Sequence, residues 1–323
     1  MRAYQIPAIG TPAQLTKIEV PEPKPDEIRV RIIACGLNFA DLLMLEGKYQ
    51  ETPEPPFTLG MEVVGFVDKL GGDVKGPTPG TPVAVFGGRG GLAEMGCFPA
   101  ERVIALDPAI SLPEAAALQI AYGTSHVALT HRARLQPGET LLVLGAAGGV
   151  GLTAVEIGKL MGARVIACAR GRDKLEIAAQ AGADHLIDAT TEDIRDAVKA
   201  LGGADVVYDP VGGDQFTAAL RACNPEGRIL TIGFASGNVP QIPANHLLVK
   251  NVDVLGFYWG GYMKFRPAVI IDSLSTLFGW LAEGRIKPHI SHMLPLERVE
   301  EGLELLRSRK STGKVVITVQ TGS

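Results

Sequence analysis

The chain has 323 residues, of which 46% are hydrophobic and 20% charged, and its formal net charge is −4. This length and this balance predict one large or two moderate globular domains and exclude a disordered chain. A slightly acidic chain also lacks the global positive field that favours binding to nucleic acid or to an anionic membrane surface.

Cysteine spacing and hydropathy indicate the cellular compartment in which the protein is expected. The cysteines are Cys35, Cys97, Cys168 and Cys223, and no two of them form a C-x-x-C pair. This spacing argues against a disulfide framework or a four-cysteine zinc site. The N-terminus has no signal-peptide pattern, and no run of about 18 apolar residues predicts a transmembrane helix. We therefore expect a cytoplasmic protein.

The first third of the chain carries short β-like runs separated by proline and glycine. The expected strands are residues 28–34, 63–67, 82–86 and 101–106. The proline-rich stretch Pro21 to Pro25 is interpreted as a rigid connector between strands. Short strands with frequent turn signals predict a compact β-rich unit.

The middle of the chain has a different rhythm, in which apolar strands alternate with helices. The expected strands are 141–144, 164–169, 185–188, 205–209, 228–233 and 252–257. The expected helices are 150–161, 173–181 and 194–199. This alternation predicts parallel βαβ units, and six strands suit a doubly wound Rossmann sheet.

After about residue 260 the pattern changes again. Helices are expected over 269–281 and 296–307, and a final strand over 314–319. Between them, His289-Ile290-Ser291-His292 is the closest approach to a histidine pair, and we interpret it as a surface turn. No serine, cysteine or histidine stands in a convincing nucleophile–base pair.

A glycine-rich turn joins the strand 141–144 to the helix that follows it. It reads Gly145-Ala146-Ala147-Gly148-Gly149-Val150-Gly151. Glycines allow close approach of the backbone to a pyrophosphate, and a helix N-terminus supplies N–H donors and a positive dipole end. The spacing is not the usual G-x-G-x-x-G, so a purely structural turn is the alternative. The strand–turn–helix context favours a nucleotide, with Ala147, Gly148, Gly149 and Val150 as contacts.

The residues that follow the strand 164–169 indicate which nicotinamide nucleotide is bound. Enzymes that use NAD usually carry an acidic residue there, which binds the ribose 2′-hydroxyl. This strand ends instead at Ala169-Arg170-Gly171-Arg172-Asp173-Lys174. Cations at this place suit a 2′-phosphate. We predict NADPH as cofactor, with Arg170 and Lys174 as the main contacts; a solvated basic turn is the alternative.

Two N-terminal segments carry a family resemblance. Ala34-Cys35-Gly36-Leu37-Asn38-Phe39-Ala40-Asp41 and Leu59-Gly60-Met61-Glu62-Val63-Val64-Gly65 resemble the zinc-binding segments of the medium-chain alcohol dehydrogenases. That family has Cys where this chain has Asn38 and His where it has Met61. An amide and a thioether are poor zinc ligands. With the glycine-rich turn and the tail Gly313-Lys314-Val315-Val316, the chain resembles the zinc-independent quinone oxidoreductase (zeta-crystallin-like) branch.

The resemblance implies a domain organisation and further cofactor contacts. A discontinuous GroES-like catalytic domain is expected over 1–122 and 259–323, with a Rossmann NADPH-binding domain over 123–258. The resemblance also places these residues near the cofactor: Thr124, Val211, Gly233, Phe257, Tyr258 and Lys314. Each of them has an ordinary packing role as its alternative.

The candidate reaction residues are Asn38, Asp41 and Tyr49, which match an N-F-x-D…G-x-Y pattern of the family. Asn38 can donate a hydrogen bond to a carbonyl or to the nicotinamide ribose. Asp41 either orients its neighbours or caps a helix that begins there. Tyr49 either donates to a substrate oxygen or packs in a core. Aromatic candidates for an apolar acceptor pocket are Phe57, Tyr258, Trp259, Tyr262 and Phe265.

The activity implied by the resemblance is hydride transfer from NADPH to a quinone, with no metal. A quinone accepts hydride without a Lewis acid because its product anion is delocalised, and a hydrogen-bond donor stabilises that anion. Reduction of α,β-unsaturated carbonyls or enoyl thioesters uses the same residues and stays open. So does a non-catalytic NADPH-binding role. The family also implies a homodimer, through edge pairing of the strand 252–257, and no nucleic-acid partner.

Overall fold

The computed structural model describes residues 1–319. The chain divides into two compact units: one contains Met1–Ile120 and the residues from Phe278 onward, and the other is Ala121–Leu277. Residues 320–323, the end of the predicted catalytic domain, lie outside the described residues. The functional boundaries predicted at 122/123 and 258/259 stay predictions.

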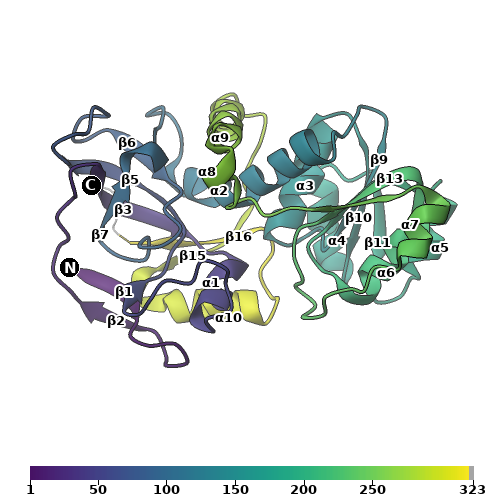
Figure 1. Cartoon of the computed structure of the whole chain (residues 1–323), viewed down its shortest axis with the longest axis horizontal. Coiled ribbons are helices and arrows are strands. Elements are labelled where there is room, and N and C mark those ends of the chain that lie inside the picture. Colours follow the sequence, from purple (N-terminus) through teal and green to yellow (C-terminus); the bar gives the residue numbers. More distant parts are fainter. Residues whose placement is uncertain (320–323) are drawn as a thin grey trace. The chain divides into compact units, whose positions relative to one another are not determined.

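The first unit is built mainly from antiparallel strands (Figure 1). Its strands are β1 (Arg2–Ile6), β2 (Gln14–Lys17), β3 (Glu27–Gly36), β4 (Phe57–Thr58), β5 (Glu62–Leu70), β6 (Pro82–Val85), β7 (Met95–Pro99), β8 (Val103–Ala105), β15 (Ile290–Pro295) and β16 (Lys314–Thr318). Its helical segments are α1 (Phe39–Leu45), η1 (Ala100–Arg102), η3 (Leu296–Arg298) and α10 (Val299–Arg307).

These strands form two sheets. The larger sheet has the strand order β15-β16-β3-β5-β6-β8, and β7 pairs with the N-terminal half of β3. The smaller sheet has the strand order β2-β1-β4. The C-terminal strand β16 pairs antiparallel with β3, so that Val316 lies opposite Gly36. The C-terminal strand therefore shares a sheet with β3 and β5, and the apolar side chains of these strands belong to one core, in which Ile32, Val63 and Ile317 are fully buried.

The second unit contains the predicted strand–helix alternation. Its strands are β9 (Thr140–Leu144), β10 (Arg164–Ala169), β11 (His185–Asp188), β12 (Ala204–Asp209), β13 (Cys223–Thr231) and β14 (Asp253–Gly256). Its helices are η2 (Ala128–Arg132), α3 (Gly149–Leu160), α4 (Arg172–Gln180), α5 (Ile194–Ala200), α6 (Gly213–Ala222), α7 (Ala244–Lys250) and α8 (Tyr262–Phe265). The unit boundaries fall within α2 (Leu112–Val127) and α9 (Pro267–Ala282).

The strand order confirms the predicted fold class. The six strands are parallel and run β11-β10-β9-β12-β13-β14, so the order reverses between β9 and β12. Leu142 and Leu144 pack with α5 and α6 in one core. Leu141, which alternation directs to the other face, meets α3 at Gly158. The sheet is therefore covered on both faces, as in a doubly wound α/β fold.

The strand expected over 101–106 is shorter in the structure, because Ala100–Arg102 form η1 and β8 begins at Val103. Another sequence interpretation is wrong. The segment His289 to His292, interpreted as a surface turn, leads into β15, which pairs in parallel with β16 and places His292 opposite Val315. Of the six β15 side chains only Leu294 is buried. An edge strand with one buried side chain lacks the alternation by which strands are recognised, so backbone pairing decides its structure.

Candidate active site

The glycine-rich turn connects β9 to α3 within the second unit. Gly145 has φ +61°, a left-handed conformation that favours glycine. A Cβ on Gly151 would overlap the carbonyl oxygen of Gly145, so only glycine permits this close turn. The first helical hydrogen bond runs from the Leu152 N–H to the Gly148 oxygen. The amides before Leu152 therefore have no acceptor within the helix.

The predicted nucleotide contacts lie together in this turn. Ala147 is buried against Ala169 and Leu175, whereas Gly148 is exposed and Gly149 and Val150 are half-exposed. The first turn of α3 carries no acidic side chain. Open amides at the start of a 12-residue helix, with no competing carboxylate, fit the pyrophosphate of a dinucleotide.

The end of β10 lies beside this turn, because β10 pairs directly with β9. Arg170 follows the strand and is exposed, and it has no ion-pair partner among residues 1–319. The neighbouring Arg172 differs, because its guanidinium donates to Glu176 at 2.9 Å. Lys174 is half-exposed in the first turn of α4. An uncommitted guanidinium at this edge fits a phosphate monoester.

An acidic residue stands at the end of the neighbouring strand β11. Asp188 Oδ1 accepts from the Gly171 N–H at 3.1 Å and from the Thr190 hydroxyl at 2.7 Å. These hydrogen bonds, chiefly that from Thr190, lower the pKa of Asp188. Because Oδ1 already accepts hydrogen bonds from local groups, Asp188 shapes the turn that carries Arg170.

The loop after β12 depends on Asp209, which sequence reasoning missed. Its Oδ1 accepts from the Val211 and Gly212 N–H groups, each at 2.8 Å. Its Oδ2 is buried and has no hydrogen-bond partner within the described chain, and burial raises the pKa of this carboxyl. Asp209 thus fixes Val211, a predicted cofactor contact, close to Gly145. The feature of the sequence that could have indicated this role is an acidic residue at the end of an apolar strand.

A buried hydroxyl cluster attaches α2 to the start of α3. Ser125 Oγ lies 2.9 Å from the Val150 oxygen, 2.8 Å from Thr153 Oγ1 and 2.9 Å from the Tyr208 hydroxyl. The predicted cofactor contact Thr124 is the preceding residue and is also buried. The cluster holds this part of α2 against the glycine-rich turn from Gly145 to Gly151, which we call the nucleotide turn.

The remaining predicted contacts of the second unit also follow strand ends. Gly233 comes after β13, and its N–H bonds to the Asp209 oxygen at 3.4 Å. Phe257 comes after β14, and its N–H bonds to the Thr231 oxygen at 3.3 Å. Because the strands are parallel, these residues and Tyr258 share the sheet edge of the nucleotide turn.

The aromatic candidates for the acceptor pocket come from both units. The Tyr262 ring lies 5.7 Å from Phe257 and 4.8 Å from Phe265. Trp259 and Tyr262 are buried, whereas Phe265 is 66% exposed. Phe57 belongs to the core of the first unit.

The candidate reaction residues of the first unit surround a buried ion pair. The Lys314 ammonium lies 2.6 Å from Glu62 Oε1, and the two side chains are 4% and 0% exposed. The ammonium also donates to the Leu37 oxygen and to Asn38 Oδ1, each at 2.8 Å. An ammonium has three N–H donors, so all three are satisfied inside the protein. Lys314, predicted near the cofactor, is therefore bound to Glu62 and the Asn38 segment.

Asn38 and Glu62 complete this cluster. The Asn38 amide donates to Glu62 Oε1 at 2.9 Å and to the Gly36 oxygen at 3.4 Å. Glu62 Oε2 accepts from the Ile120 N–H at 2.8 Å. Sequence reasoning assigned no role to Glu62. The sequence did contain an indication of this role: a carboxylate lies within the apolar run from Met61 to Val64, and a buried charge needs a partner.

Asp41 caps α1, as one of its two interpretations expected. Its Oδ2 accepts from the Asn38 N–H at 2.8 Å, and its Oδ1 from the Gly60 N–H at 3.3 Å. The side chain is fully buried. Burial raises the pKa of Asp41 to about 6, although the two amides oppose the shift. Asp41 therefore positions Asn38 and Gly60.

Tyr49 is half-buried against the core of the first unit. Met61, which stands where the zinc-binding relatives have His, is 7% exposed. Within residues 1–319 no three His, Cys, Asp or Glu side chains are grouped so that they would hold a metal ion. The predicted site residues thus form two groups. Asn38, Asp41 and Lys314 are assembled in the first unit, and the nucleotide contacts lie along one sheet edge of the second.

Family models recognise both units. Residues 24–108 match the alcohol dehydrogenase GroES-like domain, and residues 149–272 match the zinc-binding dehydrogenase model. A GroES-like domain accompanied by a Rossmann sheet defines the class as a two-domain dehydrogenase or reductase.

Individual relatives narrow the assignment. The quinone oxidoreductase-like protein 2 homolog of Nematostella vectensis is 43% identical over 91% of this chain and 82% of its own length. A quinone oxidoreductase from Thermus thermophilus, also solved with NADPH, is 32% identical with a TM-score of 0.86 over 99% of this chain and 100% of that one. The Escherichia coli quinone oxidoreductase complexed with NADPH is 28% identical, with a TM-score of 0.91 over 99% and 100%.

The chain belongs to the medium-chain dehydrogenase/reductase family, among its quinone oxidoreductase-like members. Among residues 1–319, no helix has both the length and the apolar character that a membrane crossing requires.

Proposed function

We propose that this protein is an NADPH-dependent, zinc-independent oxidoreductase that transfers hydride to a quinone. NADPH, when bound, supplies the hydride. The observation that carries the proposal is the buried Lys314–Glu62–Asn38 cluster, in the segment where zinc-dependent relatives hold Cys and His. The two quinone oxidoreductases solved with NADPH support the cofactor.

The choice of NADPH over NADH rests on the edge of the second unit. The open amides at the start of α3 suit a pyrophosphate, and the exposed Arg170 suits a 2′-phosphate. Lys174 follows in the first turn of α4 and adds a second positive charge. We propose both as contacts of the 2′-phosphate.

Independence from zinc rests on the chemistry of the side chains in the first unit. Asn38 offers an amide and Met61 a thioether, neither of which suits a catalytic zinc. The Lys314 ammonium already compensates the charge of Glu62, and it lies 2.8 Å from Asn38 Oδ1. Asn38 Oδ1 therefore already accepts a hydrogen bond inside the protein.

The acceptor chemistry needs positioning and one hydrogen-bond donor. Hydride addition to a quinone gives a hydroquinone anion, which takes its second hydrogen as a proton from water. We propose that the Tyr49 hydroxyl donates to the acceptor oxygen, where negative charge develops. Both N–H groups of the Asn38 amide bond within the protein, so we propose that Asn38 and Asp41 position this segment.

The test is NADPH oxidation with a metal chelator present, comparing quinones, alkenals and enoyl thioesters. Rapid quinone reduction that the chelator leaves unchanged is the expected result. Selective reduction of alkenals or thioesters would move the assignment to an enone or enoyl reductase. Loss of activity with the chelator would contradict the zinc-independent mechanism. Cofactor binding without turnover of any acceptor would indicate a non-catalytic NADPH-binding protein.

We also propose a homodimer formed through β14, the edge strand of the six-stranded sheet. The preceding helix α7 exposes Leu248, at 78%. An edge strand that follows an exposed apolar side chain suits a second copy. Sedimentation should give a dimer for the native protein and a monomer for Leu248→Glu. A native monomer would contradict the proposal.

A cytoplasmic location is proposed from the thiols. All four cysteines are free, and three of them are buried. Unpaired cysteines suit a reducing compartment. Localisation of the tagged protein in its own cells tests this, and retention in an organelle or outside the cell would contradict it.

A further inference from the structure

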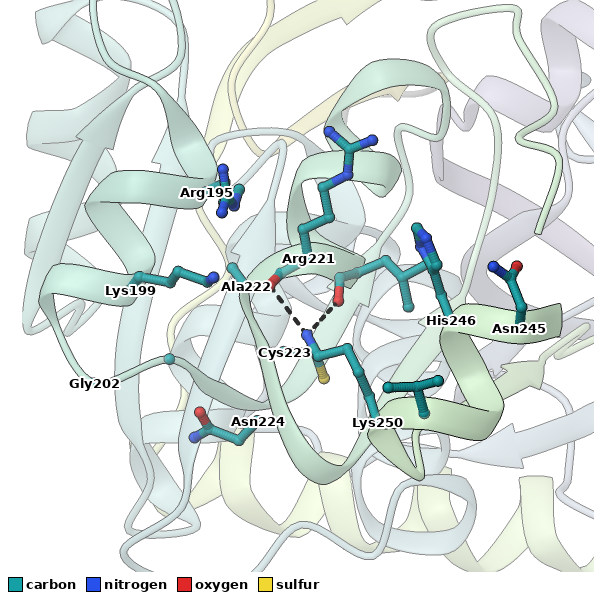
Figure 2. Close-up of a pocket in the computed structure, with 13 residues that line it drawn as sticks. Arg195, Lys199, Gly202, Arg221, Ala222, Cys223, Asn224, Asn245, His246 and Lys250 are labelled. Atoms are coloured by element: carbon teal, nitrogen blue, oxygen red, sulfur yellow. Dashed lines mark hydrogen bonds between the residues drawn. The ribbon is translucent and has the colours of Figure 1, made fainter. Parts of the chain in front are cut away.

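An open pocket of about 800 Å³ lies in the second unit, away from the nucleotide turn. It is bordered by α5, the C-terminal end of α6, and α7 (Figure 2). Strands β12 and β13 begin beside it, at Ala204 and Cys223. The nucleotide turn follows the carboxyl end of β9, which is parallel to β12. The pocket therefore lies at the amino-terminal edge of the sheet, opposite the edge that carries the nucleotide contacts.

The lining of this pocket is strongly basic. The arginine and lysine side chains that line it are Arg195, Lys199, Arg221 and Lys250, and His246 lies among them. No aspartate or glutamate lines it. In Figure 2, Lys199 extends from α5 toward α6, and Arg195 and Arg221 lie along the upper rim. Lys199 and Arg221 are exposed and have no ion-pair partner in the described part of the chain.

Lys250 makes the floor of the pocket positive. Its ammonium donates to the Leu220 and Arg221 carbonyl oxygens, at 2.9 and 3.0 Å. These carbonyls belong to the last turn of α6, the negative end of its dipole. The ammonium covers that negative end and keeps one of its three N–H donors for another acceptor.

The cations of the pocket lie close enough to affect one another. Burial is the main cause that lowers the pKa of Lys250; Cys223 opposes this shift, and the cations Lys199 and Arg195 add to it. Arg195 also lies 3.8 Å from the Asp196 carboxylate. Burial raises the pKa of the Cys223 thiol to about 11, so this side chain is neutral at pH 7. Repulsion between the cations is relieved most effectively by a multiply charged anion.

We propose that this pocket binds a small ligand carrying two or more phosphate groups. Arginine and lysine at several points of a concave surface can contact separate phosphates. The volume is in the range of small-molecule sites. The net charge of the chain, −4, disfavours an extended polyanion such as RNA, whose length would continue over surface outside the pocket.

The test is isothermal titration calorimetry with inorganic tripolyphosphate as probe. We expect saturable binding to one site in protein saturated with NADPH, because NADPH then occupies the phosphate contacts at the opposite sheet edge. The variant Lys199→Ala/Arg221→Ala should weaken binding about tenfold or more, because two charge-assisted contacts are lost. Both side chains are exposed, so the fold and NADPH-dependent turnover should not change.

Two control variants show whether tripolyphosphate binds at this pocket or elsewhere. Arg170→Ala removes a cation from the nucleotide edge, and Lys75→Ala removes an exposed lysine from the first unit. Neither should alter tripolyphosphate binding. Weakening by Arg170→Ala, with no effect of the double variant, would place the probe at the nucleotide edge and overturn the proposal.

A second arm identifies the source of the phosphates. ATP binding more tightly than tripolyphosphate, and still depending on Lys199 and Arg221, would support a nucleotide ligand. Equal affinities would support recognition of the phosphates alone. Absence of saturable binding of either probe would overturn the proposal. So would binding of an RNA oligonucleotide or anionic vesicles through these residues when neither small probe binds.

Discussion

The Lys314 ammonium and the Glu62 carboxylate, separated by 252 residues in the sequence, lie 2.6 Å apart in the interior of the first unit. Lys314 begins the C-terminal strand β16, and Glu62 begins β5. Each strand pairs with β3, so the ion pair links β5 and the C-terminal strand across one sheet.

Breaking this pair should destabilise the protein. We expect Lys314→Met to lower the free energy of unfolding by about 3–5 kcal/mol, because it leaves a buried carboxylate without its cation. Lys314→Met/Glu62→Gln should recover part of the loss. The exposed pair Lys69–Glu22 is the control, and Lys69→Met should cost less than about 1 kcal/mol. Equal losses in urea unfolding of the two single variants would contradict a special role for the buried pair.

Asp41 should make stability depend on pH. Its folded-state pKa, about 6, lies above the ordinary value, so the folded protein binds the proton more tightly than the unfolded chain. Its contribution to stability is therefore greatest below about pH 4 and is lost as pH rises through 6, by about 3 kcal/mol in total.

The Asp41→Asn variant isolates this contribution. The free energy of unfolding of the native protein minus that of the variant should fall between pH 4 and pH 7, whatever the constant cost of the lost amide contacts. Urea unfolding across this range measures the difference. A difference that stays constant with pH would show that the buried carboxyl does not titrate there.

Arg170 should decide between the two nicotinamide cofactors. We expect Arg170→Ala to weaken NADPH binding about 10- to 100-fold, because charge-assisted hydrogen bonds to the 2′-phosphate are lost. NADH binding should not change, because that phosphate is absent. Arg172→Ala is the matched control, since its guanidinium is bound to Glu176. Fluorescence titration with both cofactors measures this, and equal effects on NADH and NADPH would argue against a phosphate contact.

Substitutions at two glycines of the nucleotide turn should distinguish an effect on the free energy of unfolding from an effect on cofactor binding. Gly151→Ala should lower the free energy of unfolding by about 1–3 kcal/mol, because its Cβ would overlap the Gly145 oxygen. Gly148→Ala should cost less than about 1 kcal/mol, because its Cβ meets only that oxygen, at 3.3 Å. Both variants should weaken NADPH binding. A Gly148→Ala protein that binds NADPH normally would place the pyrophosphate elsewhere.

The sequence by itself determined the Rossmann unit and its nucleotide edge. Strand–helix alternation, the turn from Gly145 to Gly151 and the absence of an acid after Ala169 are local patterns, and each reports backbone geometry or charge within a few residues. It also drew attention to Asn38 and Met61, since the prediction that a metal ligand is missing depends on one side chain at each position.

Only the tertiary structure decided the partners of buried charges. The sequence did not pair Lys314 with Glu62, assign Asp209 to the loop before Val211, or place Lys199 and Lys250 around one pocket. The strand β15 also depends on its pairing with β16, because its side chains lack alternation. The physical reason is common to these cases: a buried charge or an edge strand is satisfied by groups far away in the chain, and that pairing leaves no periodic pattern in the sequence.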